Sequence, residues 1–323
     1  MHEISVYFNK IAGNSLGRSW EDEIRSSLFR SDLSFNYQDT LEELNQKLKK
    51  DLADKKDVII SVGGDGTVNT IIQQMAGTQS ELLVIPGGTA NDLASELGNK
   101  ASIKKIANAV RSGSIKAMDL ISVNGRYMAT NGGIGFGANV ADSINSTRAK
   151  IPMFKKIMQL SGKKIYTTFM VKELLLHPKK RYELKITTNG ATKYYSALGL
   201  LINNQSTIGG TFKVAPETLN DDGLFNITIL THKGLASAAK CIYQVARGLP
   251  PNNDPHFITF ETSSAKIESV DGKPLMFFGD GEVFGENHSW DIKLAPSSLQ
   301  VFSNNISSKC SLDFLAADNM ELI

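Results

Sequence analysis

The sequence predicts two domains of different class, an α/β domain up to about residue 118 and an all-β domain, of the sandwich type, after it. In the first part, short apolar runs rich in Val and Ile alternate with helical segments. Two of these runs end in glycine-rich loops. After about residue 116 the pattern changes to short alternating segments, separated by turn signals such as Asn124-Gly125 and Asn189-Gly190. We therefore expect domains at 1–118 and 119–305, and a segment at 306–323 that packs back on the first domain.

The first domain reads as a parallel sheet covered by helices. Leu41, Leu44, Leu48 and Leu52 form one apolar stripe, which is typical of a helix that packs on a sheet. The run Val58-Ile59-Ile60 fits a strand that is buried on both faces. The predicted strands are residues 4–8, 33–37, 58–62 and 82–85, and the predicted helices are residues 19–29, 40–56, 68–75, 93–97 and 103–111.

The second domain reads as a set of short strands with two helical insertions. The insertions are expected at residues 152–176, which include Lys155, Lys156, Lys163 and Lys164, and at residues 233–249. The predicted strands are residues 117–123, 126–131, 182–188, 192–202, 225–230, 257–262, 265–270, 275–278, 290–294 and 299–303. An all-β domain of this kind buries its core between two sheets.

The first glycine-rich loop has the chemistry of a phosphate-binding turn. Its residues are Gly63-Gly64-Asp65-Gly66-Thr67, and they lie between a predicted strand and a predicted helix. Glycines let the backbone expose its N–H groups, and a helix N-terminus attracts an anion. A carboxylate at position 65 would repel phosphate unless a cation lies between them, so Asp65 suggests Mg²⁺. The alternative is a plain strand-to-helix turn with a solvated Asp.

A second glycine loop follows the next strand, at Pro86-Gly87-Gly88-Thr89-Ala90-Asn91-Asp92. Asn91 or Asp92 is expected to cap the short helix behind it. Loops that follow neighbouring parallel strands lie at the same edge of a sheet, where α/β folds bind ligands. The two glycine loops are therefore predicted to form one site.

The second domain carries two acidic turns. Asp221-Asp222-Gly223 could offer a carboxylate and nearby carbonyl groups to a hard cation. Asp280-Gly281-Glu282 could aim two carboxylates at one point if the glycine bends the chain. Taken alone, each of these turns is also explained as a simple hairpin connection. Asp271-Gly272 is interpreted only as such a turn.

Composition narrows the class of protein. The chain of 323 residues has 41% apolar and 21% charged residues, which are values of a soluble globular protein. A net charge of +2 does not favour nucleic-acid binding. The two cysteines, Cys241 and Cys310, are too few for a disulfide framework and favour a reducing compartment. We expect no signal peptide and no transmembrane segment, and hence a cytoplasmic protein that meets a membrane only at its surface.

The ordered set of motifs resembles the diacylglycerol-kinase-type lipid kinases, with the bacterial soluble branch as the nearest likeness. The likeness covers residues 4 to about 303. It is carried by Asn9-x-x-x-Gly13, Gly63-Gly64-Asp65-Gly66-Thr67-Val68-Asn69, Pro86-Gly87-Gly88-Thr89-Ala90-Asn91-Asp92, Met118-Asp119-Leu120, Asn131-Gly132-Gly133-Ile134-Gly135-Phe136, Gly209-Gly210-Thr211-Phe212-Lys213-Val214-Ala215-Pro216, Asp222-Gly223-Leu224 and Asp280-Gly281-Glu282.

The resemblance implies a nucleotide-binding α/β domain, similar to those of diacylglycerol kinases and NAD kinases, and a β-sandwich that binds a lipid. It implies an ATP- and Mg²⁺-dependent kinase that phosphorylates a lipid hydroxyl, with diacylglycerol the leading acceptor and phosphatidic acid its product. Glu282 would take the proton from the hydroxyl, Asp280 would orient it or share the metal network, and Asp65 would act through Mg²⁺. A structural Mg²⁺ would use Asp222 and the carbonyl groups of Leu219 and Leu224. The residues expected at the nucleotide are Gly63, Gly64, Asp65, Gly66, Thr67, Val68, Asn69, Thr89, Asn91 and Asp92.

Two departures from the family pattern concern affinity and acceptor choice. Lys10 stands where the family usually has proline, and Thr211 stands where it has a third glycine. A threonine that often touches the nucleotide has no clear match, and Tyr37 or Thr40 is the nearest residue.

Several alternatives stay open. Monoacylglycerol, phosphatidylglycerol and sphingoid bases are further candidate acceptors. A soluble-metabolite kinase of the NAD-kinase type also uses a GGDGT loop, and a non-catalytic lipid-binding regulator could keep the scaffold. The lysines of residues 150–164 could dock on anionic headgroups or simply form a solvated helix face. Charge reversal at Lys163 and Lys164 would then weaken binding to anionic vesicles and leave ATP binding intact. A homodimer through sandwich edge strands is compatible with the sequence.

Overall fold

The computed structural model describes residues 3–9, 19–28, 31–38, 40–88, 90–99, 110, 114–151, 153–154, 163–209, 212–249, 251 and 253–304. Some expectations lie outside these residues: the loop at Lys10, most of the helix predicted at 103–111, Thr89, Thr211 and the segment 306–323. The lysines at 155 and 156 lie outside them too, as do the side chains of Lys163 and Lys164.

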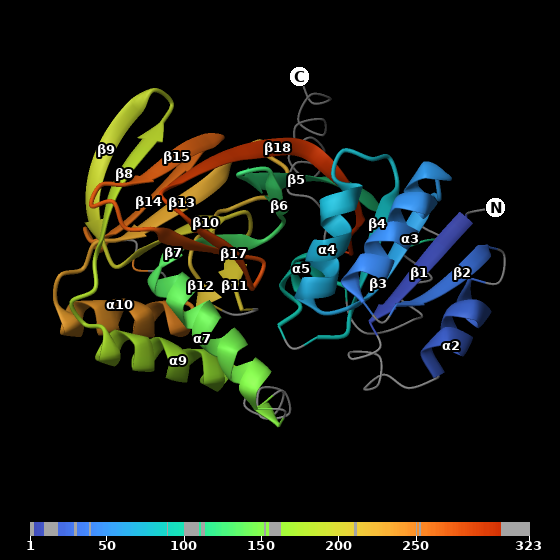
Figure 1. The fold of residues 1–323 in the computed structure, drawn as a ribbon, viewed down its shortest axis with the longest axis horizontal. Helices are drawn as coiled ribbons and strands as arrows, with labels where there is room; N and C mark the ends of the chain where they lie inside the picture. Colours follow the sequence, from blue (N-terminus) through green and yellow to red (C-terminus); the bar gives the residue numbers. More distant parts are fainter. Residues whose placement is uncertain are drawn as a thin grey trace, which may run out of the picture.

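The first part of the chain is a parallel α/β layer, as the sequence predicts (Figure 1). Its strands β1 (Glu3–Asn9), β2 (Asp32–Gln38), β3 (Val58–Gly63) and β4 (Glu81–Pro86) lie in the order β2-β1-β3-β4 and are all parallel. The helices are α2 (Ser19–Ser27), α3 (Leu41–Ala53), α4 (Asp65–Met75) and α5 (Asp92–Glu96). Every residue of β3 is buried, which explains its continuous apolar run.

Both faces of this sheet are packed. One face buries Ile59 and Leu82 against residues of α3, α4 and α5. The other buries Val58 and Ile60 against Ile24 of α2. Thr40 caps α3, because its hydroxyl accepts a hydrogen bond from Glu43 N at 3.2 Å.

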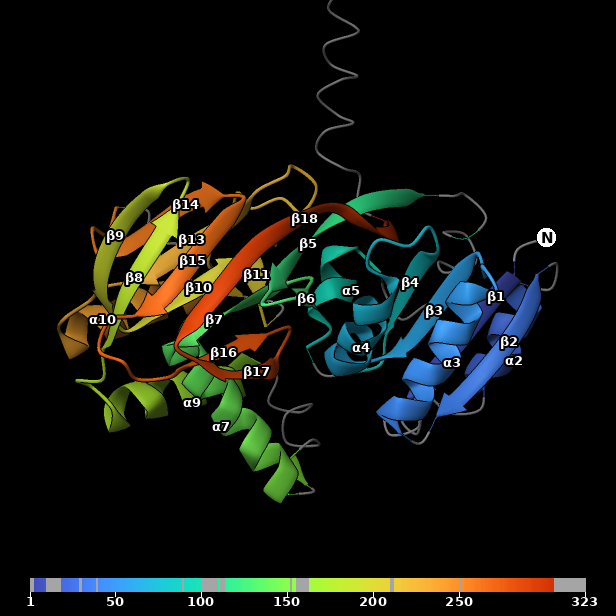
Figure 2. The same ribbon diagram turned by 45° about the horizontal axis from the view of Figure 1, so that its top comes forward.

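The second part is a β-sandwich with helices on one side (Figures 1 and 2). One sheet has the order β14-β13-β10-β7-β16-β17. The other contains β18, β15, β8, β9, β5 and β6. Between them lies a core that includes Ile134, Ile227 and Phe277 from the first of these sheets and Ile267 and Trp290 from the second. Figure 1 shows α7, α9 and α10 together along the lower edge of this sandwich.

The bounds of these elements are as follows. The strands are β5 (Ile115–Val123), β6 (Arg126–Met128), β7 (Asn131–Gly135), β8 (Tyr182–Thr188), β9 (Ala191–Ala197), β10 (Gly199–Asn203), β11 (Thr207–Ile208), β12 (Phe212–Lys213), β13 (Phe225–Leu230), β14 (Phe257–Thr262), β15 (Ser264–Ser269), β16 (Leu275–Gly279), β17 (Glu282–Asn287) and β18 (Ser289–Phe302). The helices are α7 (Phe136–Lys150), α9 (Lys163–Leu176) and α10 (Leu235–Ala246).

A single long strand joins the two parts. β18 pairs with β15 and β5, and near its end Gln300 and Val301 pair in parallel with Glu81 and Leu82 of β4. One ten-stranded sheet therefore runs through both halves of the molecule. The domain boundary that we place at 118/119 falls inside β5.

The structure corrects several predicted elements. Residues 136–150 form α7, which the sequence analysis did not predict, because its start at Phe136-Gly137 follows a glycine-rich strand and resembles a loop. β17 was missed for a similar reason, since it follows directly on an Asp-Gly turn. The strand predicted at 126–131 covers β6 and only the first residue of β7, so most of β7 was missed. β18 is one strand with a register shift between Ala295 and Leu299, where two strands are predicted at 290–294 and 299–303. Leu41, which is predicted to lie in the buried apolar stripe of α3, is instead 60% exposed.

A buried carboxylate ties α3 to the parallel sheet. Asp51 is 1% exposed and accepts hydrogen bonds from Tyr7 OH at 2.7 Å and from Lys47 Nζ at 2.5 Å. Burial opposes its ionisation, but the hydrogen bonds, that of Lys47 first, hold the pKa of Asp51 below its ordinary value.

We expect Asp51→Asn to lower the free energy of unfolding by about 1–3 kcal/mol at pH 7, because the amide keeps one acceptor and loses the charge that pairs with Lys47. A depressed folded-state pKa contributes stability above the unfolded-state pKa of about 4, and that stability is lost as the pH falls through the folded-state pKa. The variant should therefore lose less stability than the wild type between neutral pH and about pH 3. Urea unfolding at both pH values measures this, and parallel losses in the two proteins would refute it.

Candidate active site

The two glycine loops meet at the carboxyl ends of β3 and β4. Gly87 N donates a hydrogen bond to Gly63 O at 2.7 Å. A methyl group built on Gly88 would lie 2.6 Å from Gly64 Cα, closer than real contacts allow. Glycine is therefore required here because the two backbones touch, and the prediction that both loops form one site agrees with this packing.

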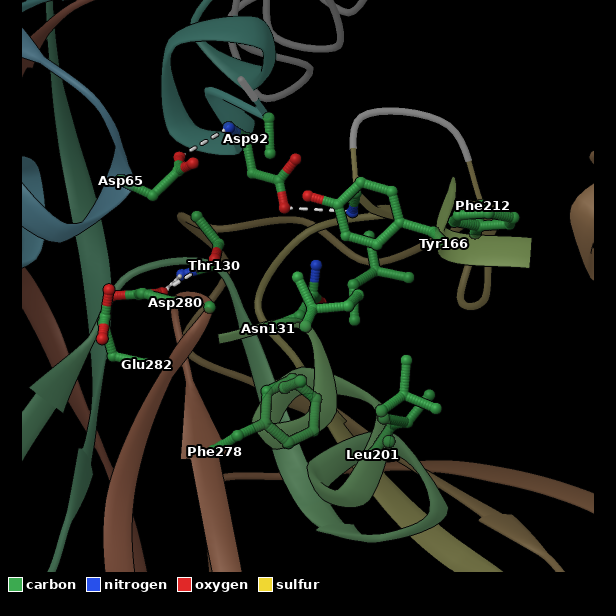
Figure 3. Close-up of a pocket in the computed structure, with 18 of the residues that line it drawn as sticks. Asp65, Asp92, Thr130, Asn131, Tyr166, Leu201, Phe212, Phe278, Asp280 and Glu282 are labelled. Atoms are coloured by element: carbon green, nitrogen blue, oxygen red, sulfur yellow. Dashed lines mark hydrogen bonds between the residues drawn. The ribbon is translucent and has the colours of Figure 1, made fainter. Parts of the chain in front are cut away.

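Asp65 links the two loops. It is the first residue of α4, and its carboxylate accepts hydrogen bonds from Asn91 N at 3.0 Å and Asp92 N at 2.8 Å (Figure 3). Burial raises the pKa of Asp65, and the nearby charge of Asp280 raises it further, whereas the two backbone N–H groups lower it. A cation beside Asp65 would favour its charged form.

Two other residues expected at the phosphates, Thr67 and Val68, are already engaged within the protein. Val68 of α4 is 5% exposed, and its side chain packs in the core. Thr67 N and Val68 N both donate to Gly64 O, so their amides are used inside the loop. Asp65 and Gly66 supply first-turn amides that have no acceptor in the helix ladder, and the Asp65 amide interacts with its own carboxylate. The Gly66 amide is therefore the better placed of the two to meet an anion.

Asn91 and Asp92 shape the second loop. Asn91 has a left-handed backbone (φ 52°), and its side chain bonds Gly88 twice, with Oδ1 accepting from Gly88 N at 2.8 Å and Nδ2 donating to Gly88 O at 2.9 Å. Asp92 Oδ2 accepts a hydrogen bond from Gly209 N at 3.0 Å, which ties the loop to the second half of the chain. Thr89 lies outside the described residues.

Asp280 anchors the Asp-Gly-Glu turn in a buried network. The turn joins β16 to β17 with positive φ at Asp280 (51°) and Gly281 (78°), as in a tight hairpin. The Asp280 carboxylate accepts from Thr130 N at 2.8 Å, Thr130 Oγ1 at 2.7 Å, Ala129 N at 3.0 Å and Asn69 Nδ2 at 2.7 Å. Because Asn69 belongs to α4, this network joins the turn to the first glycine loop. The side chain of Asn69 points to Asp280.

Glu282 faces the loop from the other side of the turn. Its side chain is 39% exposed, and Oε1 lies 3.7 Å from Arg148 Nη2. A methyl group built on Gly66 would lie 3.0 Å from Glu282 Oε1. Glu282 is thus in place beside the first turn of α4. Both carboxylates line the cavity, but Asp280 is 7% exposed and held in its network, whereas the side chain of Glu282 is 39% exposed.

A single cavity of about 750 Å³ extends from these carboxylates into the second half of the chain. Its polar end includes Gly64, Asp65, Gly66 and Glu282. Away from that end the lining is mainly apolar and comes from α7, α9, α10, β12 and the six-stranded sheet. These residues include Phe136, Val140, Ile144, Met170, Leu200, Leu201, Phe212, Leu230, Cys241, Ile242, Val245, Phe257 and Phe278. Figure 3 shows Leu201 and Phe278 on the side of the cavity away from Asp65.

Several polar residues of the cavity were not identified from the sequence, and three of them are ionisable. Arg126 bonds Asn69 Oδ1 at 3.3 Å and stacks on Phe284 at 3.9 Å, and burial lowers its pKa. Arg148 lies beside Glu282. Burial raises the pKa of Tyr166 to about 12, with the charge of Asp92 adding to the effect. None of the three stands in a recognisable motif, so only their position in the fold identifies them.

The charges of the cavity favour a divalent cation. The charged side chains that line it are Asp65, Asp92, Asp280, Glu282, Arg126 and Arg148, which leaves an excess of two negative charges. Within the described residues no three His, Cys, Asp or Glu side chains converge as a complete metal site. Mg²⁺ often takes one or two protein carboxylates and completes its shell with substrate phosphates. Asp65 fits that role.

The second predicted metal site remains a prediction. Leu219, Asp222 and Leu224 lie in the loop before β13, where Asp222 Oδ1 accepts a hydrogen bond from Leu224 N at 3.0 Å. The turn is held by Asp119, whose Oδ2 accepts from Gly223 N at 2.8 Å. Its oxygen donors would suit Mg²⁺, with a single carboxylate at most from Asp222.

Comparison with known structures defines the class of fold. The chain is similar to a diacylglycerol kinase from Bacillus anthracis, with a TM-score of 0.68 and 18% identity over 94% of this chain and 97% of that one. It is also similar to an NAD kinase from Archaeoglobus fulgidus, solved in complex with ATP, with a TM-score of 0.52 and 14% identity over 94% of each chain. These similarities show a kinase fold shared by both groups.

The sequence places the chain within that class. Residues 3–123 match the diacylglycerol kinase catalytic domain, and residues 133–303 match the YegS C-terminal NAD kinase beta sandwich-like domain. The protein belongs to the lipid kinase family that combines these two domains. It is 29% identical to a diacylglycerol kinase of Bacillus subtilis over 71% of this chain and 72% of the relative. It is 27% identical to one of Mycobacterium tuberculosis over 76% of both chains.

Proposed function

We propose that this protein transfers the γ-phosphate of ATP to a hydroxyl group of a lipid, with diacylglycerol as the leading acceptor and phosphatidic acid as its product. The observation that carries the proposal is the continuous cavity. Its polar end has the glycine loop, Asp65 and Glu282, and its other end is apolar. A phosphate donor and an acyl chain can therefore lie in one space, with the acceptor hydroxyl between them beside Glu282.

The residues have distinct roles in this reaction. Glu282 accepts the proton of the acceptor hydroxyl as its oxygen attacks the γ-phosphorus, and the bond to the bridging oxygen breaks to release ADP. The amide of Gly66 binds a phosphate oxygen at the N-terminus of α4. Asp65 would hold Mg²⁺, which neutralises the phosphate charge when bound. Asp280 positions Glu282 through its network and does not itself touch the reacting atoms.

Two other functions are less well supported. An NAD-type kinase would need polar groups for a second nucleotide, and the second half of this cavity offers mainly apolar side chains. A non-catalytic regulator would not need Asp65 and Glu282 in place at the same loop. The described helices are too short or too polar to cross a membrane. The enzyme would therefore reach its lipid at the membrane surface.

Acyl-chain selectivity tests the proposal. Val245 lines the cavity from α10, and Val245→Phe adds volume there. We expect kcat/KM for a long-chain diacylglycerol to fall by about tenfold or more, because a filled pocket rejects the chain. A short-chain diacylglycerol should change by less than about threefold, since it does not reach the position.

The measurement is phosphate transfer to both lipids by wild type and variant at saturating ATP and Mg²⁺. NAD in place of lipid is the second acceptor tested. An equal fall in kcat/KM for the long-chain and short-chain lipids would show that the acyl chain does not reach Val245. Label found in NAD by both proteins would favour the metabolite kinase.

A further inference from the structure

The outward face of α9 is apolar, unlike that of an ordinary surface helix. Its exposed positions follow one face, at i, i+3, i+4, i+7 and i+8. They are Thr168, Val171, Lys172, Leu175 and Leu176. Val171 is 46% exposed, Leu175 60% and Leu176 61%. A solvated helix would place charged or polar side chains at these positions, so three large apolar residues in one stripe need a partner.

The neighbouring helix α10 extends this face. Tyr243 is 62% exposed, and Leu249, just beyond the helix, is 61% exposed. Arg247 lies 5.9 Å from the Tyr243 ring. Among the described residues, fourteen large apolar side chains are exposed, and eight of them come from the end of α7, from α9 and from α10 with its flanks. More than half of the exposed large apolar side chains thus come from these helices and the residues next to them, and the helices lie along the lower edge of the molecule in Figure 1.

The α9 and α10 segments carry exposed basic residues and no exposed acidic ones. Between residues 163 and 180 the only acidic residue is Glu173, and between 233 and 251 there is none. Glu173 is 8% exposed and is engaged by Asn139 at 2.8 Å and His177 at 3.2 Å. The exposed basic side chains are Lys172, Lys179, Lys180, Lys233, Lys240 and Arg247.

From this pattern we infer that the α9–α10 surface, defined by these apolar and basic residues, docks on an anionic lipid bilayer. Apolar side chains enter the acyl boundary while basic side chains bind the headgroups. Two copies of this chain would bring like charges together, so the basic residues favour an anionic partner over a second copy. The lysines of residues 155–164 are not counted in this surface, because their side chains lie outside the described residues.

The α9–α10 surface lies next to the cavity, so docking there would bring the membrane close to the active site. This step rests on the proposed function. Met170 of α9 and Ile242 and Val245 of α10 line the apolar part of the cavity. The two helices therefore have one side on the cavity and the other on the bilayer. A lipid acceptor would pass from the membrane to the active site across their width.

Vesicle binding without turnover tests the docking. The probes are vesicles of phosphatidylcholine alone and of phosphatidylcholine mixed with phosphatidylglycerol. The variants are Leu175→Ser with Leu176→Ser, and Lys179→Glu with Lys240→Glu. Their matched controls are Tyr194→Ser on β9, where the ring is 68% exposed, and Lys49→Glu with Lys50→Glu on α3. None of these residues lines the cavity.

We expect the wild type to sediment with the mixed vesicles and each α9–α10 variant to bind them about tenfold or more weakly. The controls should bind within about twofold of wild type, and added salt should weaken the wild type more than the Lys179/Lys240 variant. Wild-type binding by both variants, or equal losses in the controls, would overturn the inference. A dimer that the leucine variant dissociates, without any vesicle binding, would also overturn it.

A soluble acceptor separates this inference from the proposed function. With a short-chain diacylglycerol dissolved as monomers, the α9–α10 variants should turn over at the wild-type rate. If no lipid is phosphorylated but vesicle binding still follows the variants, the docking stands and the kinase proposal falls. If lipid is phosphorylated but the variants bind vesicles as the wild type does, the kinase proposal stands and the docking inference falls.

Discussion

Replacing Glu282 with glutamine is expected to lower kcat for lipid phosphorylation by about 10²- to 10⁴-fold. Glutamine has nearly the same shape but cannot accept the proton of the acceptor hydroxyl. The side chain is 39% exposed and lies beside Arg148 at 3.7 Å, so its exchange should leave the fold intact. The affinity for ATP with Mg²⁺ should stay within about threefold of the wild type, because the phosphates meet the loop at α4.

A matched control is available on the same strand. Glu286 is an exposed carboxylate of β17 that does not line the cavity. Glu286→Gln should keep wild-type kcat. Steady-state kinetics and nucleotide titration on all three proteins give the answer. A Glu282→Gln enzyme with near wild-type kcat would show that another group takes the proton.

Asp280→Asn is expected to lower the free energy of unfolding by about 2–4 kcal/mol. The carboxylate accepts from Ala129 N, Thr130 N, Thr130 Oγ1 and Asn69 Nδ2, and it is 7% exposed. An asparagine can accept through one oxygen only, and its NH₂ group would face N–H donors. Buried donors would then lack acceptors, which is costly in a site with little water.

The same change should reduce activity, because the Asp280 turn carries Glu282 and connects it to α4. Asp271→Asn is the control, since Asp271 also precedes glycine in a turn but is exposed and bonds only its own loop, at Ser269 and Lys273. It should leave the urea unfolding midpoint close to that of the wild type, because an exposed ion pair contributes little to stability. Urea unfolding compares the two variants. Equal losses would mean that the Asp280 network does not anchor the turn.

The parts of the fold that follow from local pattern could be predicted from sequence. The continuous apolar run of β3 predicts a strand buried on both faces, and every residue of β3 is buried. The glycines at 63–64 and 87–88 predict the loops, and in the structure the two backbones touch there. The turns at Asn124 and Asn189 have positive φ, as their Asn-Gly sequences predict. Local chemistry decides these features, so no knowledge of the rest of the chain is needed.

Other features depend on contacts between distant residues. Asn69 reads as a phosphate-loop residue, yet its partner Asp280 is 211 positions away. Arg126 and Arg148 enter the site only because β6 and α7 reach it in the folded chain. α7 was missed because its first turn follows a glycine-rich strand. The ten-stranded sheet could not be predicted either, since β18 reaches β4 from the other end of the sequence.

The most direct test of the central claim is transfer of labelled γ-phosphate from ATP, with Mg²⁺, to a panel of acceptors by the wild-type protein. The panel comprises diacylglycerol, monoacylglycerol, phosphatidylglycerol and sphingosine in mixed micelles, with NAD in solution. We expect the label in the lipid fraction, with diacylglycerol among the labelled species, and none in NAD. Label in NAD alone, or none in any acceptor while ATP binds, would contradict the claim that the glycine loops and the apolar cavity form one lipid kinase site.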